Sequence, residues 1–265
     1  MATKTEVSNH FARQIVNIAA YVAFVVIAVC AGTIPFNGNY LMDVVARYNP
    51  DIVPAAYACY VAHVVVYVFL LCFAIYQALS HKRNDKAIRS IDLTFLVFVV
   101  ASIVWTFGFF YGAQALALIG MFASSIAAFM IYHKLGIGKD RVTGRHYWCV
   151  HFPFSLVAAG ALFGIVAQTS IFCMHYDLVW WGAGQLGWNM SAALLIAFFG
   201  SFILHYRPDV GFGLTLTWLA AGVAVYQNNE NVLLTTTFAL MALYFGLLTF
   251  SNAMHRPRVS KRDTK

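Results

Sequence analysis

The sequence predicts an all-α, polytopic membrane helix bundle with eight transmembrane helices, and three observations carry this prediction. Of its 265 residues, 61% are hydrophobic and only 10% are charged, and the mean hydropathy is +0.72. Soluble domains are about half apolar and about a quarter charged. The apolar residues also fall into long runs, and a helix needs about 20 such residues to cross a hydrocarbon core. Finally, the basic residues gather in alternate connections between the runs.

The apolar runs give the expected spans. These cover residues 14–34, 54–79, 92–112, 114–133, 148–172, 178–204, 211–226 and 231–251. The seventh run is short, so run length alone allows seven or eight helices. The start of the chain is polar with mixed charge, and the first run is long enough to span. We therefore expect a retained first helix rather than a cleaved signal peptide.

The distribution of Lys and Arg decides the count. With eight helices, 16 of the 17 basic residues fall on one side of the membrane, and only Arg47 falls on the other. The 16 are Lys4, Arg13, Lys82, Arg83, Lys86, Arg89, Lys134, Lys139, Arg141, Arg145, Arg207, Arg256, Arg258, Lys261, Arg262 and Lys265. The positive-inside rule then puts both termini on the cytoplasmic or matrix side. Merging the last two spans would put the basic tail on the wrong side.

The net charge of +7 follows from this topology. The basic residues form a collar that faces anionic lipid headgroups. They lie in short connections without a recognisable nucleic-acid motif, so we expect membrane lipids and no nucleic acid as partners.

The membrane interior lacks the residues that most membrane chemistry needs. All ten carboxylates fall in connections or at helix ends: Glu6, Asp43, Asp51, Asp85, Asp92, Asp140, Asp177, Asp209, Glu230 and Asp263. Ion paths, proton relays and counter-ions are built from intramembrane ionisable residues. HExxH and GxSxG are absent. The five cysteines are scattered without a CxxC pair, which favours buried small side chains over a metal site or disulfides. We therefore expect neither an enzyme nor a metal site.

His63 is the one histidine expected at depth, about 13 Å along its helix at a rise of 1.5 Å per residue. No second deep histidine offers a matching haem ligand. Tyr60, His63 and Tyr67 have the spacing i, i+3, i+7 and therefore share one helical face, which we expect to point inward because polar atoms in hydrocarbon need partners. This face could form a ligand-pocket wall, or a polar packing cluster joined by Gln168 or Asn189.

Several segments in order resemble the translocator-protein/tryptophan-rich sensory protein family (TspO/MBR), in particular its longer members. "IPFNG" (34–38), "PAAY" (54–57) and "YQ" (76–77) resemble the family's first loop and second helix. "VWTFGFFYG" (104–112) resembles its third-helix Trp-x-x-x-Phe-Phe stretch, and "YWCVHFPFSLVAAGALFGIVAQ" (147–168) resembles its fifth helix. "RPDVGFGLTLTWLAAGVAV" (207–225) resembles a segment of the longer members.

The resemblance implies a five-helix core over residues 14–172, three additional helices over 178–251 and a basic tail over 252–265, within a single membrane domain over 1–265. It also implies a pocket for a tetrapyrrole, a sterol or a lipid. The pocket residues it indicates, together with the His63 face, are Tyr57, Tyr60, His63, Tyr67, Trp105, Phe109, Phe110 and Gln168.

The chain departs from the family pattern at three places. Ala62-His63 replaces an expected Trp-Gly pair, Gly160 falls where another tryptophan is expected, and Gln168 falls where the family has Asn. Losing two tryptophans removes flat apolar surface on which a macrocycle could stack.

Two GxxxG spacings pair Gly108 with Gly112 and Gly160 with Gly164, and such spacings let helices approach closely in lipid. They indicate bundle packing, closure of the pocket, or a face that docks a partner.

Two functions remain open. The first is a non-enzymatic, TspO-like protein that binds a hydrophobic ligand within the bundle. The second is an accessory subunit of a larger membrane complex, such as a respiratory complex, in contact with other subunits or a second copy of itself. Either would suit the mitochondrial inner membrane, another organelle membrane or a bacterial plasma membrane. A transporter is typically built from inverted repeats around a site at the membrane midplane, and no internal repeat is evident.

Overall fold

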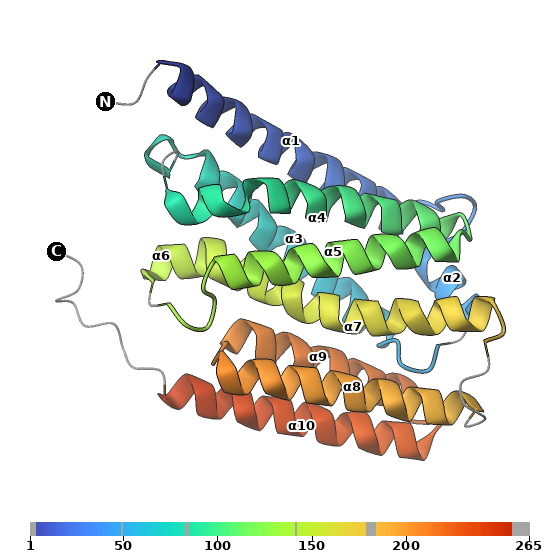
Figure 1. The fold of residues 1–265 in the computed structure, drawn as a ribbon. Coiled ribbons are helices and arrows are strands. Elements are labelled where there is room, and N and C mark those ends of the chain that lie inside the picture. Colours follow the sequence, from blue (N-terminus) through green and yellow to red (C-terminus); the bar gives the residue numbers. More distant parts are fainter. Residues whose placement is uncertain (1–3, 49, 83–84, 141, 179–183, 256–265) are drawn as a thin grey trace.

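The computed structural model describes residues 4–48, 50–82, 85–140, 142–178 and 184–255, and these residues form helices joined by short connections (Figure 1). The helices are α1 (Lys4–Thr33), α2 (Leu41–Tyr48), α3 (Ala56–Ala78), α4 (Lys86–Phe110), α5 (Gln114–Lys134), α6 (Gly144–His146), α7 (Phe152–His175), α8 (Gly184–Tyr206), α9 (Val210–Gln227) and α10 (Val232–His255). A 3-10 turn (Ser80–Lys82) follows α3, and a π-helical turn (Tyr147–His151) joins α6 to α7.

Eight of these helices are long and apolar enough to cross a membrane, which confirms the predicted count. They are α1, α3, α4, α5, α7 with the turns before it, α8, α9 and α10. The short seventh run forms a separate 18-residue helix, α9. The start of α1 and the end of α10 lie at the same end of the bundle (Figure 1), which we call the basic end. The side of the membrane that this end faces stays a prediction. Arg83, Arg141 and the tail from residue 256 lie outside the described residues.

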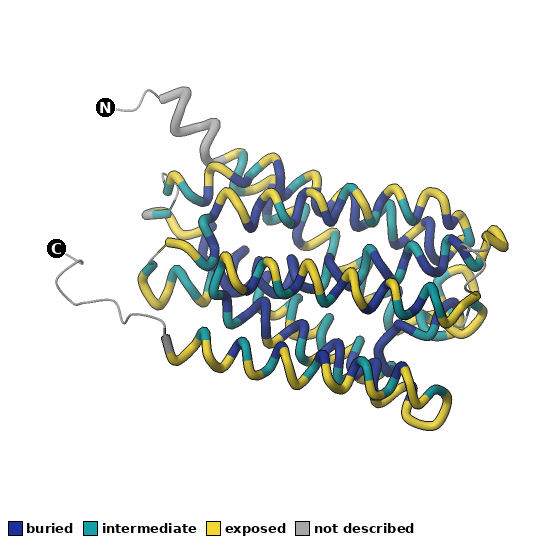
Figure 2. The backbone as a smooth tube through the Cα atoms, turned by 60° about the horizontal axis from the view of Figure 1, so that its bottom comes forward, coloured by how far each residue is buried: buried dark blue, intermediate teal, exposed yellow. Residues whose placement is uncertain are grey.

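Five of the spans close into a ring. Helix α1 contacts α3 and α4, α5 contacts α4 and α7, and α3 contacts α7. Helices α8, α9 and α10 pack together on the outer side of α7 (Figure 1). Helix α7 is therefore central, and it is the most buried of the eight spans. Figure 2 shows buried residues on the inward sides of the helices and exposed residues on the outer sides, as expected for a bundle that turns apolar side chains toward lipid as well.

Glycines set the close approach of α4 and α5. A Cβ on Gly108 would lie 2.6 Å from the backbone nitrogen of Ala117, and one on Gly120 would lie 2.5 Å from that of Trp105. Small residues allow such contacts between helices in lipid. Gly112 has a different role from the one expected, because it follows the end of α4 with φ = 75° and forms the turn into α5. That φ value suits glycine.

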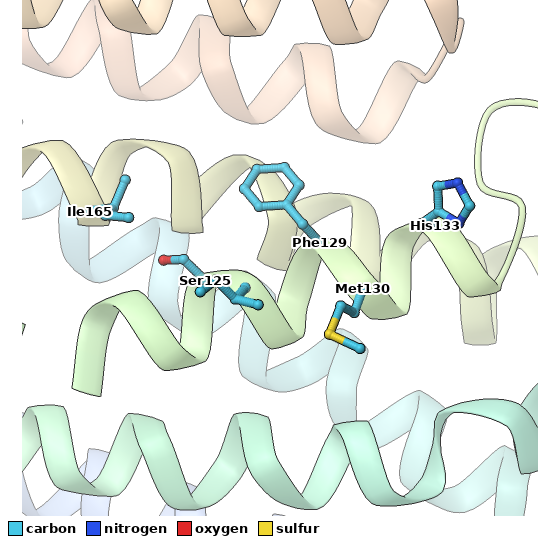
Figure 3. Close-up of a pocket in the computed structure, with 6 residues that line it drawn as sticks. Ser125, Phe129, Met130, His133 and Ile165 are labelled. Atoms are coloured by element: carbon cyan, nitrogen blue, oxygen red, sulfur yellow. The ribbon is translucent and has the colours of Figure 1, made fainter. Parts of the chain in front are cut away.

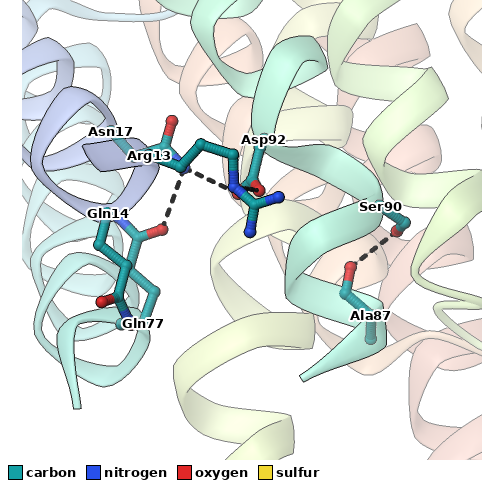
Figure 4. Close-up of polar contacts among 7 residues, drawn as sticks. All are labelled: Arg13, Gln14, Asn17, Gln77, Ala87, Ser90 and Asp92. Carbon is teal, nitrogen blue, oxygen red and sulfur yellow. Dashed lines mark hydrogen bonds and ion pairs between the residues drawn. The ribbon is translucent and has the colours of Figure 1, made fainter. Parts of the chain in front are cut away.

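A polar cluster at the basic end fixes α1 to α3 and α4 (Figure 4). Arg13 Nε lies 2.8 Å from Asp92 Oδ2, and Asn17 Nδ2 donates to Asp92 Oδ1 at 2.9 Å. Gln14 Nε2 donates to the backbone oxygen of Gln77 at 2.5 Å. Asp92 lies two turns into α4, where the paired arginine and the amide offset the cost of removing its charge from water.

Helix α9 joins the last three helices to the ring. A Cβ on Gly222 would lie 2.7 Å from the Ala58 Cβ of α3, and Ala55 N donates to the Gly222 oxygen at 3.0 Å. Trp218 Nε1 donates to the Ala58 oxygen at 2.9 Å. Since the backbone at the start of α3 bonds directly to α9 through Ala55 and Ala58, the last three helices are an integral part of this bundle.

Candidate functional site

The first part of the candidate site is a chain of hydrogen bonds across α4, α7 and α5. Trp105 Nε1 donates to Gln168 Oε1 at 3.0 Å, and Gln168 Nε2 donates to Gln114 Oε1 at 3.0 Å. Gln168 and Gln114 are 2% and 0% exposed. Two of the predicted ligand-binding residues, Trp105 and Gln168, therefore bond to each other. Gln114 was not predicted. Its amide side chain stands at the start of an apolar span, where a polar group needs a partner, and this could have indicated it.

The second part is an aromatic cluster at the end opposite the basic one. Phe109 and Phe110 are buried and pack in one cluster with Val44 and Val45 of α2. The loop before α2 closes over them: Asn37 Nδ2 donates to the Phe110 oxygen at 3.3 Å, and the rings of Phe36 and Phe110 are 5.6 Å apart. The chain's own first loop thus occupies the surface that the predicted aromatic wall offers at this end.

The third part is the face of α3 that carries His63. Its end toward α2 is open, with Tyr57 53% and Tyr60 37% exposed, whereas His63 and Tyr67 are half-buried. His63 Nδ1 lies 2.7 Å from the backbone oxygen of Cys59, and the rings of His63 and Tyr67 are 6.0 Å apart. A carbonyl oxygen only accepts, so Nδ1 is the donor in this contact, and a neutral imidazole with its proton on Nδ1 offers Nε2 as an acceptor. The face points inward at His63 and Tyr67, but not at Tyr60.

Gln168 and Asn189, the residues considered as partners of His63 in a polar packing cluster, bond to other side chains. Gln168 bonds to Trp105 and Gln114, and Asn189 Nδ2 donates to Asp51 Oδ2 at 2.6 Å. Both amides therefore have partners away from His63. The spacing of residues on one helix identified the shared face, but it could not show which side chain of another helix each amide meets.

Gly160 is only partly buried, and the space beside it is open. A Cβ built there would meet nothing within 4 Å, although α7 is the most buried span. On the same side of α7, Leu156 and Phe163 are buried, and Ala167 packs in one cluster with Cys59 of α3. Since α3 and α7 run in opposite directions (Figure 1), the helical rise then places Gly160 near the level of Tyr67 and Gly164 near that of His63. A Cβ on Gly164 would meet only the flexible end of Met121, at 3.2 Å.

A second polar hub, which the sequence did not reveal, joins the loop before α3 to α8 and α9. Asp51 Oδ2 accepts from Gln185 Nε2 at 3.0 Å as well as from Asn189, and Gln227 Nε2 donates to the Asp51 backbone oxygen at 2.7 Å. Burial raises the pKa of the Asp51 carboxyl above its ordinary value, and the hydrogen bonds from Asn189 and Gln185 oppose this rise. The partners are 134 and 138 residues away in sequence, so no local pattern indicates the hub.

In the described part of the chain, no three His, Cys, Asp or Glu side chains come together in a group that could hold a metal ion. The interior instead combines apolar walls with a few hydrogen-bonding groups. This arrangement suits an uncharged, mostly apolar ligand.

Fold and site together define an α-helical integral membrane protein with eight spans. Residues 14–250 match the family model described as TSPO-like protein, and the chain therefore belongs to the TSPO-like family. The match confirms the resemblance drawn from the motifs, and it extends through the three additional helices to within α10. No curated protein and no solved structure matches the chain significantly.

Proposed function

We propose that this protein binds a hydrophobic small molecule, without catalysis, in the space between α3 and α7. The observation that carries the proposal is the open space at Gly160, on the most buried helix of the bundle. Interiors of membrane bundles are close-packed, so open space beside half-buried His63 and Tyr67 is the place where a ligand would fit.

The neighbouring groups favour a slender ligand, such as a sterol or lipid, over a tetrapyrrole. A flat macrocycle would need the aromatic wall at Trp105, Phe109 and Phe110. Reaching it would break the bond between Trp105 and Gln168, and each buried polar group left without a partner costs about 1–3 kcal/mol. A slender ligand could instead lie along α3 and α7 and donate a hydroxyl hydrogen bond to His63 Nε2.

The test is ligand binding by purified protein with the space filled. Cholesterol, protoporphyrin IX and a fluorescent phospholipid are titrated against the wild type, Gly160→Leu and the matched control Gly160→Ala. The leucine variant is expected to lose at least about tenfold in affinity for the bound ligand, which is roughly 1.4 kcal/mol, while the alanine variant keeps most of it. Unchanged helix content by circular dichroism shows that the fold is retained. The proposal would be overturned if the wild type bound none of the three ligands, or if the wild type and both variants bound with equal affinity.

A second candidate function, an accessory subunit of a larger membrane complex, is favoured by the outer surface of α8. Phe198, Phe199, Phe202 and Tyr206 form an exposed aromatic row there, with Phe198 and Phe202 stacked at 6.4 Å. Native electrophoresis of source membranes in a mild detergent separates the two functions. Migration as a monomer or small oligomer supports the ligand binder, and migration within one large complex supports the subunit.

A further inference from the structure

A groove on the outer surface of the bundle lies between α5 and α7, away from the interior space (Figure 3). It has a volume of about 390 Å³ and is lined by Ser125, Ile126, Phe129, Met130, His133 and Ile165. Its lining is apolar except for Ser125, whose hydroxyl donates to the Ala161 oxygen at 3.4 Å, and His133. A groove of this size on a membrane-spanning surface has the dimensions of a small-molecule site.

The groove has a polar end and an apolar end. His133 is exposed and lies in the last turn of α5, at the basic end, whereas Ile165 lies in the middle of α7 (Figure 3). The polar end of the groove therefore lies at the level of the lipid headgroups, and the apolar end lies in the hydrocarbon core. An amphipathic molecule would bind with its polar group at His133 and its apolar chain toward Ile165.

A second cation, Arg207, lies at the same end of the bundle, beyond the residues that line the groove. Arg207 follows α8, and its Nη1 donates to the oxygen of Ile137 in the turn after α5, at 3.0 Å. Its guanidinium also lies 5.6 Å from the ring centre of Tyr132, next to His133 in the chain. A Cβ on Gly138 would lie 2.8 Å from Arg207 Cβ, so the turn holds the base of this side chain in place. Within the described residues Arg207 pairs with no carboxylate.

We propose that this groove is a binding site for an anionic phospholipid, independent of the proposed function. One acyl chain lies along Phe129 and Ile165, and the phosphate lies between His133 and Arg207. Charge complementarity selects the occupant: arginine matches the geometry of a phosphate, and the imidazole adds an N–H donor. Because Arg207 follows α8 and His133 belongs to α5, the bound lipid would join the five-helix ring to the last three helices.

The test is native mass spectrometry of the purified, delipidated protein with added phosphatidylglycerol or phosphatidylcholine of identical acyl chains. The wild type is expected to retain phosphatidylglycerol preferentially. Arg207→Gln should lower its occupancy about fivefold, the factor for one cation near an anionic surface. Lys139→Gln, an exposed change in the turn after α5, is the matched control and should retain the lipid. Ile165→Phe, which fills the groove, should lower retention of both lipids.

Equal retention of the two lipids, or equal loss in the Arg207 and Lys139 variants, would overturn the proposal. A second copy of the chain in place of lipid, seen as a dimer mass that Ile165→Phe abolishes, would overturn it as well. Arg207→Gln also removes the hydrogen bond to the Ile137 oxygen, so this variant must show the same helix content as the wild type by circular dichroism. Ile165→Phe, which leaves Arg207 in place, tests the groove independently.

Discussion

At the scale of single residues, two of the residues predicted to bind a ligand bond to each other, whereas Gly160 has open space beside it. Trp105 Nε1 donates to Gln168 Oε1, and a Cβ on Gly160 would meet nothing within 4 Å. We expect Trp105→Phe to destabilise the protein by about 1–3 kcal/mol, because the buried Gln168 oxygen loses its donor. Thermal unfolding in detergent measures this. Gln168→Leu alone also removes the donor to Gln114 Oε1, so the double variant Trp105→Phe/Gln168→Leu is compared with the sum of the two single variants. It should be less destabilised than that sum, because the Trp105–Gln168 bond is lost only once; strictly additive effects would contradict a direct bond.

The second prediction at this scale concerns the Asp51 carboxyl, whose pKa is raised by burial above its ordinary value of about 3.8. The folded protein therefore holds this proton more tightly than the unfolded chain does. The stability from this group is fully present below about pH 3.8 and is lost as the pH rises through the raised pKa. Relative to wild type, Asp51→Asn should gain stability across that weakly acidic range. Melting curves over this range test it, and a constant difference would contradict it.

At the scale of elements, the α4–α5 hairpin depends on glycine where the two backbones meet. A Cβ on Gly120 would lie 2.5 Å from the Trp105 nitrogen and 2.9 Å from the Ala101 oxygen. We expect Gly120→Ala to destabilise the protein by about 1–3 kcal/mol through overpacking. Gly160→Ala, the same change in open space, should cost less than about 1 kcal/mol. Comparing the melting temperatures of the two variants is the measurement, and equal effects would argue against the close approach.

Some elements of the fold and of the candidate site could be predicted from the sequence, and others could not. The eight spans follow from composition and charge, because the bilayer requires long apolar helices. The short helix α2 (Leu41–Tyr48) was missed, since eight residues in a connection lie below the length that hydropathy detects. Trp105 and Phe109 were recognised by family resemblance, but the bond from Trp105 to Gln168 joins residues 63 positions apart. Such pairings depend on how the helices pack, which no local pattern contains.

At the scale of the whole molecule, the orientation in the membrane rests on charge. Lys139 and Glu230 are exposed in connections at opposite ends of the bundle. The positive-inside rule puts Lys139 on the cytoplasmic or matrix side. In a variant without the five native cysteines, an impermeant maleimide added outside sealed, right-side-out vesicles should label Glu230→Cys. It should label Lys139→Cys only after the vesicles are opened. The reverse pattern would invert the topology, and it would also move the proposed lipid site to the other leaflet, because His133 and Arg207 lie at the Lys139 end.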